Sequence, residues 1–147
     1  MSRIASSAAS IVVGIVLALA LVWCWAFIAA NNPLPALLIK NGLSGTAFWA
    51  VITATDFIIN VILCLPAALA LRKLGHNIRI NTALAVASFA ITGAVVIGLP
   101  LFSYEIRIGV QYALLLASLP VAVWLLSRLD RGALNNSFKP SPLRGSA

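Results

Sequence analysis

Long apolar runs, separated by short segments rich in polar residues, make up most of this chain. They lie at 8–30, 47–71, 82–103 and 108–127. A helix needs about 20 apolar residues to cross roughly 30 Å of hydrocarbon, and each run approaches or exceeds that length. The pattern predicts an all-α integral membrane protein, a four-transmembrane-helix bundle. We expect one membrane domain over residues 1–128, followed by a mobile polar tail over residues 129–147.

Composition supports lipid as the solvent of this chain. Of its 147 residues, 62% are hydrophobic and 9% are charged, and the mean hydropathy is +1.06. Soluble domains are nearer half apolar and a quarter charged. The net charge of +7 does not indicate nucleic acid, because the basic residues occur singly or in pairs and form no continuous basic face. We expect them to contact anionic lipids instead.

The basic residues also predict an orientation. Positively charged residues in short loops are retained on the cytoplasmic side of a membrane. Two of them, Lys40 and Arg107, belong to the first and third connections. The remaining eight flank the other ends of the runs: Arg3, Arg72, Lys73, Arg79, Arg128, Arg131, Lys139 and Arg144. This distribution predicts cytoplasmic termini and a multi-pass protein of a bacterial inner membrane or a plasma membrane.

The connection after the first run is longer than a simple turn. Within "NNPLPALLIKNGLSG", the stretch "PALLIK" is apolar enough to form a short helical turn along the membrane interface. The alternative is a hydrophobic lid that covers the end of the bundle.

Small residues at every fourth position predict which helices pack most closely. Helices in lipid associate where small side chains let their backbones approach and where polar groups bond across the contact. The first and third runs carry this spacing, so we expect them to form a tight pair. The residues concerned are Ser10, Gly14 and Ala18 in the first run and Ala90, Ala94 and Gly98 in the third.

One acidic side chain interrupts the second run, in the stretch "TATDFIIN" at residues 53–60. Asp56 would lie about 13 Å below the outer edge, near the middle of the hydrocarbon. A carboxylate at this depth costs about 3 kcal/mol, which confines it to a bundle interior, a wet cavity or a partner surface. At helical spacing Thr53, Asp56 and Asn60 form one polar stripe. No basic residue is expected at the same depth, so we predict a protonated or cation-bound carboxyl.

Three roles for Asp56 remain open at this point. A neutral carboxyl could hydrogen-bond to a neighbouring helix and hold the bundle together. Asp56 could also couple to an ion or substrate, with Thr53 and Asn60 as supports, or it could pair with another membrane subunit. The number of spans resembles that of small multidrug-resistance transporters, in which an intramembrane carboxylate exchanges protons for cationic drugs. Those transporters carry the carboxylate on their first helix, whereas Asp56 lies in the second run.

Enzymatic chemistry finds little support in the sequence. "GLSG" at residues 42–45 resembles the GxSG motif of rhomboid proteases, which would make Ser44 the nucleophile. The single histidine, His76, is predicted on the opposite side of the membrane, beyond hydrogen-bond reach. Cys24 and Cys64 fall inside apolar runs without the spacing of a metal site, so we expect small buried side chains there. We therefore predict no enzyme activity, no metal and no cofactor.

Our first hypothesis for function is a small polytopic membrane protein that acts as a non-enzymatic accessory or interaction subunit of a membrane assembly. The alternative is a small oligomeric transporter or channel subunit that uses Asp56 as an intramembrane proton or cation site. Four thin helices leave little room for an internal pathway, so the alternative predicts a homo-oligomer. The first hypothesis predicts a different membrane protein as the partner.

Overall fold

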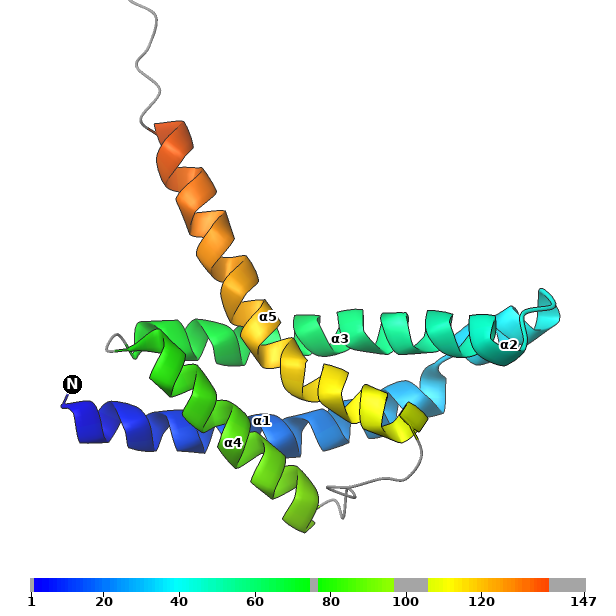
Figure 1. Ribbon diagram of the computed structural model, residues 1–147, viewed down its shortest axis with the longest axis horizontal. Coiled ribbons are helices and arrows are strands. Elements are labelled where there is room, and N and C mark those ends of the chain that lie inside the picture. Colours follow the sequence, from blue (N-terminus) through cyan, green and yellow to red (C-terminus); the bar gives the residue numbers. More distant parts are fainter. Residues whose placement is uncertain (1, 75–76, 97–105, 138–147) are drawn as a thin grey trace, which may run out of the picture.

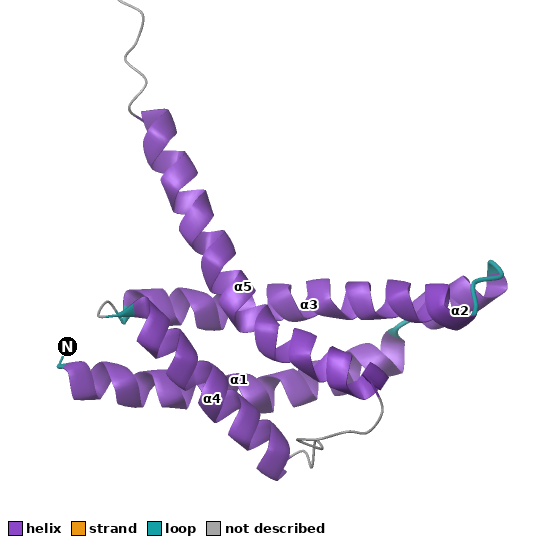
Figure 2. Cartoon of the chain, viewed as in Figure 1, coloured by secondary structure: helices purple, strands orange, loops and turns teal. Residues whose placement is uncertain are grey.

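Every regular element in the described part of the chain is a helix (Figure 2). The computed structural model describes residues 2–74, 77–96 and 106–137, of which 131–137 are described by their backbone. The helices are α1 (Arg3–Asn31), α2 (Leu34–Lys40), α3 (Gly45–Lys73), α4 (Ile78–Val96) and α5 (Ile106–Ser137). The prediction of an all-α fold is confirmed for these residues. Four of the helices are long and apolar enough to cross a membrane.

Local sequence signals explain where the first helices begin and end. The Ser2 side chain caps α1 by accepting a hydrogen bond from the Ala5 amide at 3.3 Å. Asn32 and Pro33 then end α1, because proline cannot continue the hydrogen-bond ladder of a preceding helix. The stretch predicted as a short helical turn forms α2. Gly42 and Gly45 allow the turn into α3, since both adopt positive φ, at 77° and 60°.

The last helix is longer than the fourth apolar run. α5 continues to Ser137, so residues 129–137 of the predicted tail are helical and residues 138–147 lie outside the described part. The segment from 121 to 137 contains no proline, and a lone glycine, Gly132, does not interrupt the helix. Its final turns extend beyond the other long helices (Figure 1). The end of the predicted third span, including Gly98, also lies outside the described residues.

The four long helices associate as two pairs. α1 packs chiefly against α4, and α3 packs chiefly against α5 (Figure 1). Smaller contacts of α1 with α3, and of α4 with α3 and α5, join the two pairs. Within the described residues, the backbones of α1 and α5 do not approach each other closely. The bundle is therefore continuous but has a boundary between the pairs, and this boundary contains the candidate site described below.

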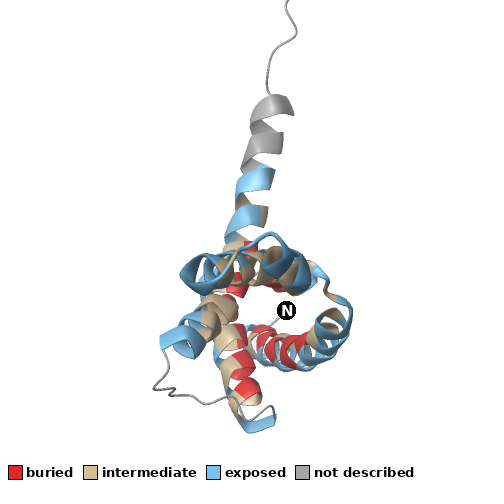
Figure 3. Cartoon of the chain, turned by 90° about the vertical axis from the view of Figure 1, so that its right-hand side faces the viewer, coloured by how far each residue is buried: buried red, intermediate tan, exposed pale blue. Residues whose placement is uncertain are grey.

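Burial in this bundle follows an unusual pattern for a folded chain. Buried positions face the inside of the bundle and exposed positions cover its outside (Figure 3). The interior contains many small and polar residues, while large apolar side chains such as Val95 and Phe27 are 78% and 73% exposed. The buried polar residues are Ser6, Ser10, Asn60, Asn81, Thr82, Ser88 and Ser118. An apolar exterior around a partly polar interior is the pattern expected where lipid surrounds the protein.

α1 and α4 approach each other closely at Gly14. A Cβ atom added to this glycine would overlap the Ser88 hydroxyl and the Ala85 carbonyl oxygen. The Ser88 hydroxyl also donates to the carbonyl oxygen of Ile11 on α1 at 3.1 Å. Glycine thus allows the two backbones to come close enough for a side chain of one helix to bond to the main chain of the other.

The other predicted packing residues lie on or beside this contact. Ser10 and Ala18 are buried on the same face of α1 as Gly14. On α4, Ala90 and Ala94 are half-buried, and the atoms that meet Gly14 belong to Ala85 and Ser88. One polar bond at the far end adds to the contact: the Asn81 amide nitrogen donates to the Ser6 hydroxyl at 3.0 Å.

The packing at Gly14 predicts a position-specific effect of one methyl group. Gly14→Ala should lower the free energy of unfolding by about 1–3 kcal/mol, because the added Cβ forces α1 and α4 apart. Gly109→Ala on α5 is the matched control, since nothing lies within 4 Å of its added Cβ. We expect this control to leave stability unchanged or slightly raised. Reversible unfolding in mixed micelles measures both, and equal stabilities of the two variants would contradict the close contact.

Candidate functional site

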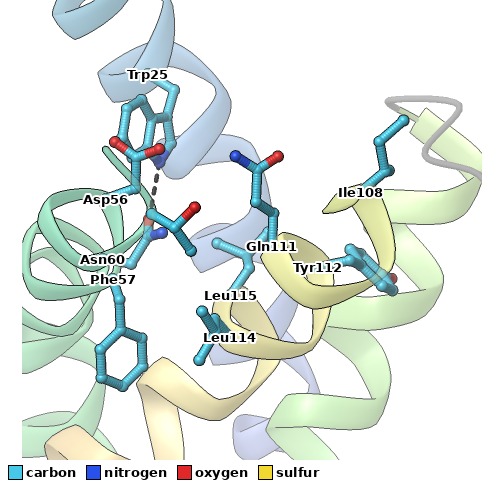
Figure 4. Close-up of a pocket in the computed structure, with 10 residues that line it drawn as sticks. Trp25, Asp56, Phe57, Asn60, Ile108, Gln111, Tyr112, Leu114 and Leu115 are labelled. Atoms are coloured by element: carbon cyan, nitrogen blue, oxygen red, sulfur yellow. Dashed lines mark hydrogen bonds between the residues drawn. The ribbon is translucent and has the colours of Figure 1, made fainter. Parts of the chain in front are cut away.

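A pocket lies at the boundary between the two helix pairs, around the Asp56 side chain. α1 supplies one wall, α3 a second and α5 the third (Figure 4). Its volume is about 220 Å³. We call it the Asp56 pocket; it is lined by Trp25, Thr53, Asp56, Phe57, Asn60, Ile108, Gln111, Tyr112, Leu114 and Leu115. The three residues of the predicted polar stripe are therefore together in one pocket.

A hydrogen bond joins α1 and α3 in the lining of this pocket. The Trp25 indole N–H donates to the Asn60 side-chain oxygen at 2.8 Å (Figure 4). Asn60 is buried, and its amide oxygen would otherwise be without a donor. The bond fixes the indole ring over the pocket and joins the two helix pairs. Asn60 is thus the residue of the stripe that bonds across the helices in this chain.

Asp56 lies one helical turn before Asn60 and has no such partner. It is half-buried, and its carboxylate makes no hydrogen bond or ion pair with any residue that the structure describes. Gln111 on the opposite wall presents a carboxamide to the same space (Figure 4). Asp56 is the twelfth residue of the 29-residue α3, so it lies near the middle of the helix. The pocket therefore combines a carboxylate available for a ligand with polar groups on two helices.

An apolar pocket adjoins the Asp56 pocket and shares three of its lining residues. Its volume is about 260 Å³, and Trp25, Tyr112 and Leu115 stand between the two spaces. The rest of its lining comes from α1 and α4: Ala18, Leu21, Val22, Phe89 and Gly93. The Tyr112 hydroxyl donates to the Ala90 carbonyl oxygen at 3.3 Å, which joins α5 to α4. Aromatic rings with satisfied polar ends thus separate the polar space from the apolar one.

A groove between α3 and α5 leads toward the Asp56 pocket from the helix ends. It has a volume of about 520 Å³ and shares Thr53, Phe57, Gln111 and Leu114 with the pocket. At its outer end the Arg107 guanidinium lies over the Trp49 ring, 5.4 Å from the centroid. A cation over an indole face is held by the ring quadrupole. Arg107 is therefore engaged by Trp49 at the mouth of the groove and makes no ion pair with Asp56.

Three of the ten lining residues of the Asp56 pocket were predicted from the sequence. Asp56, Thr53 and Asn60 were expected from the polar stripe of the second run, but Gln111 and Tyr112 on α5 were not. Gln111 is a polar residue within the fourth apolar run, and that signal was available in the sequence. Trp25 on α1 was not expected at this site either. Nothing in the spacing along one helix indicates which side chain of another helix faces it.

The remaining candidates have structural positions. Cys64 is buried and lies 3.3 Å from the Ser118 hydroxyl, between Sγ and Oγ, while Cys24 is half-buried. Ser44 is the residue before the first turn of α3, and His76 lies outside the described part. Within that part, no group of three or more His, Cys, Asp and Glu side chains could hold a metal ion.

Comparison with protein-family models, with curated proteins and with solved structures finds no match to this chain.

The bond between Trp25 and Asn60 predicts a difference between two neighbouring tryptophans. Trp25→Phe should lower the free energy of unfolding by about 1 kcal/mol, because the Asn60 oxygen loses its donor. Trp23→Phe is the matched control, as Trp23 is 79% exposed. Unfolding in mixed micelles, followed by far-ultraviolet circular dichroism, measures both variants. An equal loss in the two would show that the Trp25 to Asn60 bond does not stabilise the bundle.

Proposed function

We propose that this protein is a small multi-pass membrane protein that binds a proton or a cation at Asp56, as a subunit of an oligomeric transporter or channel. The observation that carries the proposal is the Asp56 carboxylate, which lies near the middle of a membrane-length helix without a partner among the described residues. A carboxyl in that setting is neutral, or it is balanced by a cation.

The surroundings of Asp56 support binding rather than packing alone. The bond between α1 and α3 is made by Asn60, so the carboxylate is not needed for it. Thr53 and Gln111 add oxygen atoms to the walls of the pocket, and the groove between α3 and α5 gives a route to it. Oxygen ligands suit protons carried by water and hard cations. A pocket of about 220 Å³ holds such a ligand without room for a continuous pathway.

An oligomer supplies what the single chain lacks. The pocket ends within the bundle, and a pathway across the membrane needs further walls. Exposed apolar residues on every long helix offer surfaces on which copies of the chain can associate in lipid, including Ile11, Ile58, Ile91 and Val110. We therefore propose a homo-oligomer in an inner or plasma membrane, with both termini cytoplasmic.

A second candidate is an accessory subunit of another membrane assembly. The final turns of α5 support it, because they extend beyond the other long helices and present an exposed apolar Leu129 (Figure 1). In this role Asp56 would meet a basic or polar side chain of the partner. The first candidate predicts cation flux by the protein alone, whereas the second predicts assembly with a different protein.

The proposed orientation predicts the positions of two reporters. A reporter enzyme active only outside the cytoplasm should be active when fused after Lys40 and inactive when fused after Ala147. A reporter active only inside should give the opposite pattern. The physical reason is the uneven distribution of basic residues between the two sets of connections. Cytoplasmic activity from the Lys40 fusion would overturn the orientation.

The role of Asp56 predicts the effect of a single substitution on flux. In proteoliposomes with an imposed pH gradient, Asp56→Asn should reduce cation or proton flux at least about tenfold, because the neutral amide cannot exchange a proton and has no negative charge to balance a cation. Asp130→Asn is the matched control, since Asp130 pairs with Arg72 at the other end of the bundle. It should retain flux, provided that both variants reconstitute equally.

Two results would decide against transport. Flux that is unchanged in Asp56→Asn would remove Asp56 from any pathway. Absent flux in the unmodified protein, together with loss of a copurifying partner in Asp56→Asn and not in Asp130→Asn, would favour the accessory subunit.

A further inference from the structure

A second surface groove lies on the side of the bundle where α4 meets α5. We infer that it binds one anionic phospholipid. We call it the α4–α5 groove. Its volume is about 850 Å³, within the range of roughly 300–1,000 Å³ that is usual for ligand sites. Its lining residues are Ile78, Arg79, Thr82, Ala83, Val86, Ala87, Ala90, Pro120, Val123, Trp124 and Ser127. The inference rests on the membrane insertion proposed above, but not on the role of Asp56.

The groove has one charged end and an apolar length. Arg79 lies in the first turn of α4, and Ala90 lies eleven residues later at the other end, about 17 Å away along the helix. This length matches one leaflet, which is about half of a hydrocarbon core of roughly 30 Å. Alanines and valines form the floor between the two ends. An acyl chain fits such a surface, because it requires no polar partner along its length.

The polar side chains of the groove leave one group for a ligand. The Thr82 hydroxyl donates to the Ile78 carbonyl oxygen at 2.7 Å, and the Ser127 hydroxyl donates to the Trp124 carbonyl oxygen at 2.6 Å. The Arg79 guanidinium, in contrast, has no hydrogen bond or ion pair with the residues that the structure describes. The groove therefore matches a ligand that is anionic at one end and apolar along its length.

Further positive charge lies beside the same end. The Arg128 guanidinium is 5.2 Å from the centroid of the Trp124 ring, and this ring is 54% exposed. Tryptophan and arginine in this arrangement suit the level of lipid headgroups, where the ring is partly apolar and the cation meets phosphate. Asp130 does not offset this charge, because it pairs with Arg72.

A second copy of the chain would not supply a good carboxylate ligand for Arg79. It contains three acidic residues. Asp56 lies near the middle of α3, Asp130 is paired with Arg72, and Glu105 belongs to the connection predicted on the opposite side of the membrane. A second copy could cover the alanines of the groove but would bring no free carboxylate to Arg79. A phospholipid supplies both the apolar chain and the anionic group.

Native mass spectrometry on protein released from nanodiscs tests the site. The nanodiscs contain phosphatidylglycerol and phosphatidylcholine with the same acyl chains, so that the lipids differ in headgroup charge alone. We expect the protein to retain one phosphatidylglycerol in preference to phosphatidylcholine. Equal retention of the two lipids by a correctly reconstituted protein would overturn the lipid site. Failure of the protein to enter nanodiscs at all would overturn the proposed membrane insertion instead.

Two substitutions test the two ends of the site separately. Arg79→Gln should weaken phosphatidylglycerol retention about fivefold, because one basic contact is lost. Lys40→Gln is its control and should leave retention unchanged, because Lys40 lies in the connection predicted on the opposite side of the membrane from Arg79. Ala87→Phe fills the groove without changing the charge and should also displace the lipid. Ala20→Phe, on an exposed position of α1 outside the groove, is its control.

Three results with these variants would contradict the proposed lipid site. Retention in Arg79→Gln equal to that in Lys40→Gln would show that the headgroup does not contact Arg79. Retention in Ala87→Phe equal to that in Ala20→Phe would place the lipid elsewhere. A stable dimer that Ala87→Phe alone dissociates would assign the groove to a second copy and overturn the lipid site.

Discussion

The outside of this bundle is as apolar as its inside, and that constraint decides how the helices can recognise one another. In water, burial of apolar surface selects the contact faces of helices. Here large apolar side chains cover the outside, so their burial cannot distinguish one face from another. Selection falls to small residues and to polar bonds. Gly14 brings α1 against α4, and a bond of Ser88 to the Ile11 carbonyl oxygen fixes the register of that pair.

The same constraint explains the bonds at each remaining contact. Trp25 bonds to Asn60 between α1 and α3, and Tyr112 bonds to the Ala90 carbonyl oxygen between α5 and α4. α3 and α5 share the contact of Cys64 with Ser118 and the bonds that Arg72 makes to the Leu126 carbonyl oxygen and to Asp130. The contacts of α1 with α3, of α4 with α5 and of α3 with α5 thus each contain at least one polar bond. Asp56 is notable because it faces a pocket and takes no part in these bonds.

Apolar run length was enough to predict the helical class of the fold, but not the partners within it. The length and hydropathy of the runs predicted four long helices, because both properties are local to a segment. The position of Asp56 relative to Thr53 and Asn60 also followed from the helical period. The contact of Trp25 with Asn60 could not be predicted in this way, since it depends on the rotation of α1 and α3 about their axes. Gln111 was missed for the same reason, although its polarity within the fourth run was visible.

The composition after the fourth apolar run did not indicate how far α5 extends. A polar segment with glycine, after the last apolar run, was predicted to be a mobile tail. The backbone stays helical through Ser137 because helix formation does not require an apolar face when the ladder of main-chain hydrogen bonds simply continues from a preceding stable turn.

The division into two helix pairs has a mechanical consequence. α3 and α4 are joined by a short connection at one end, and Asp56 lies 17 residues before Lys73, about 26 Å from that end along α3. The segment that contains α2 joins the pairs at the opposite end, between α1 and α3, so a small rotation of one pair against the other is restrained at both ends. The bonds of Trp25 with Asn60 and of Tyr112 with Ala90 cross the boundary between the pairs and resist this rotation. The Asp56 pocket thus lies between two covalent links, where breaking two polar bonds changes the space around a single carboxylate.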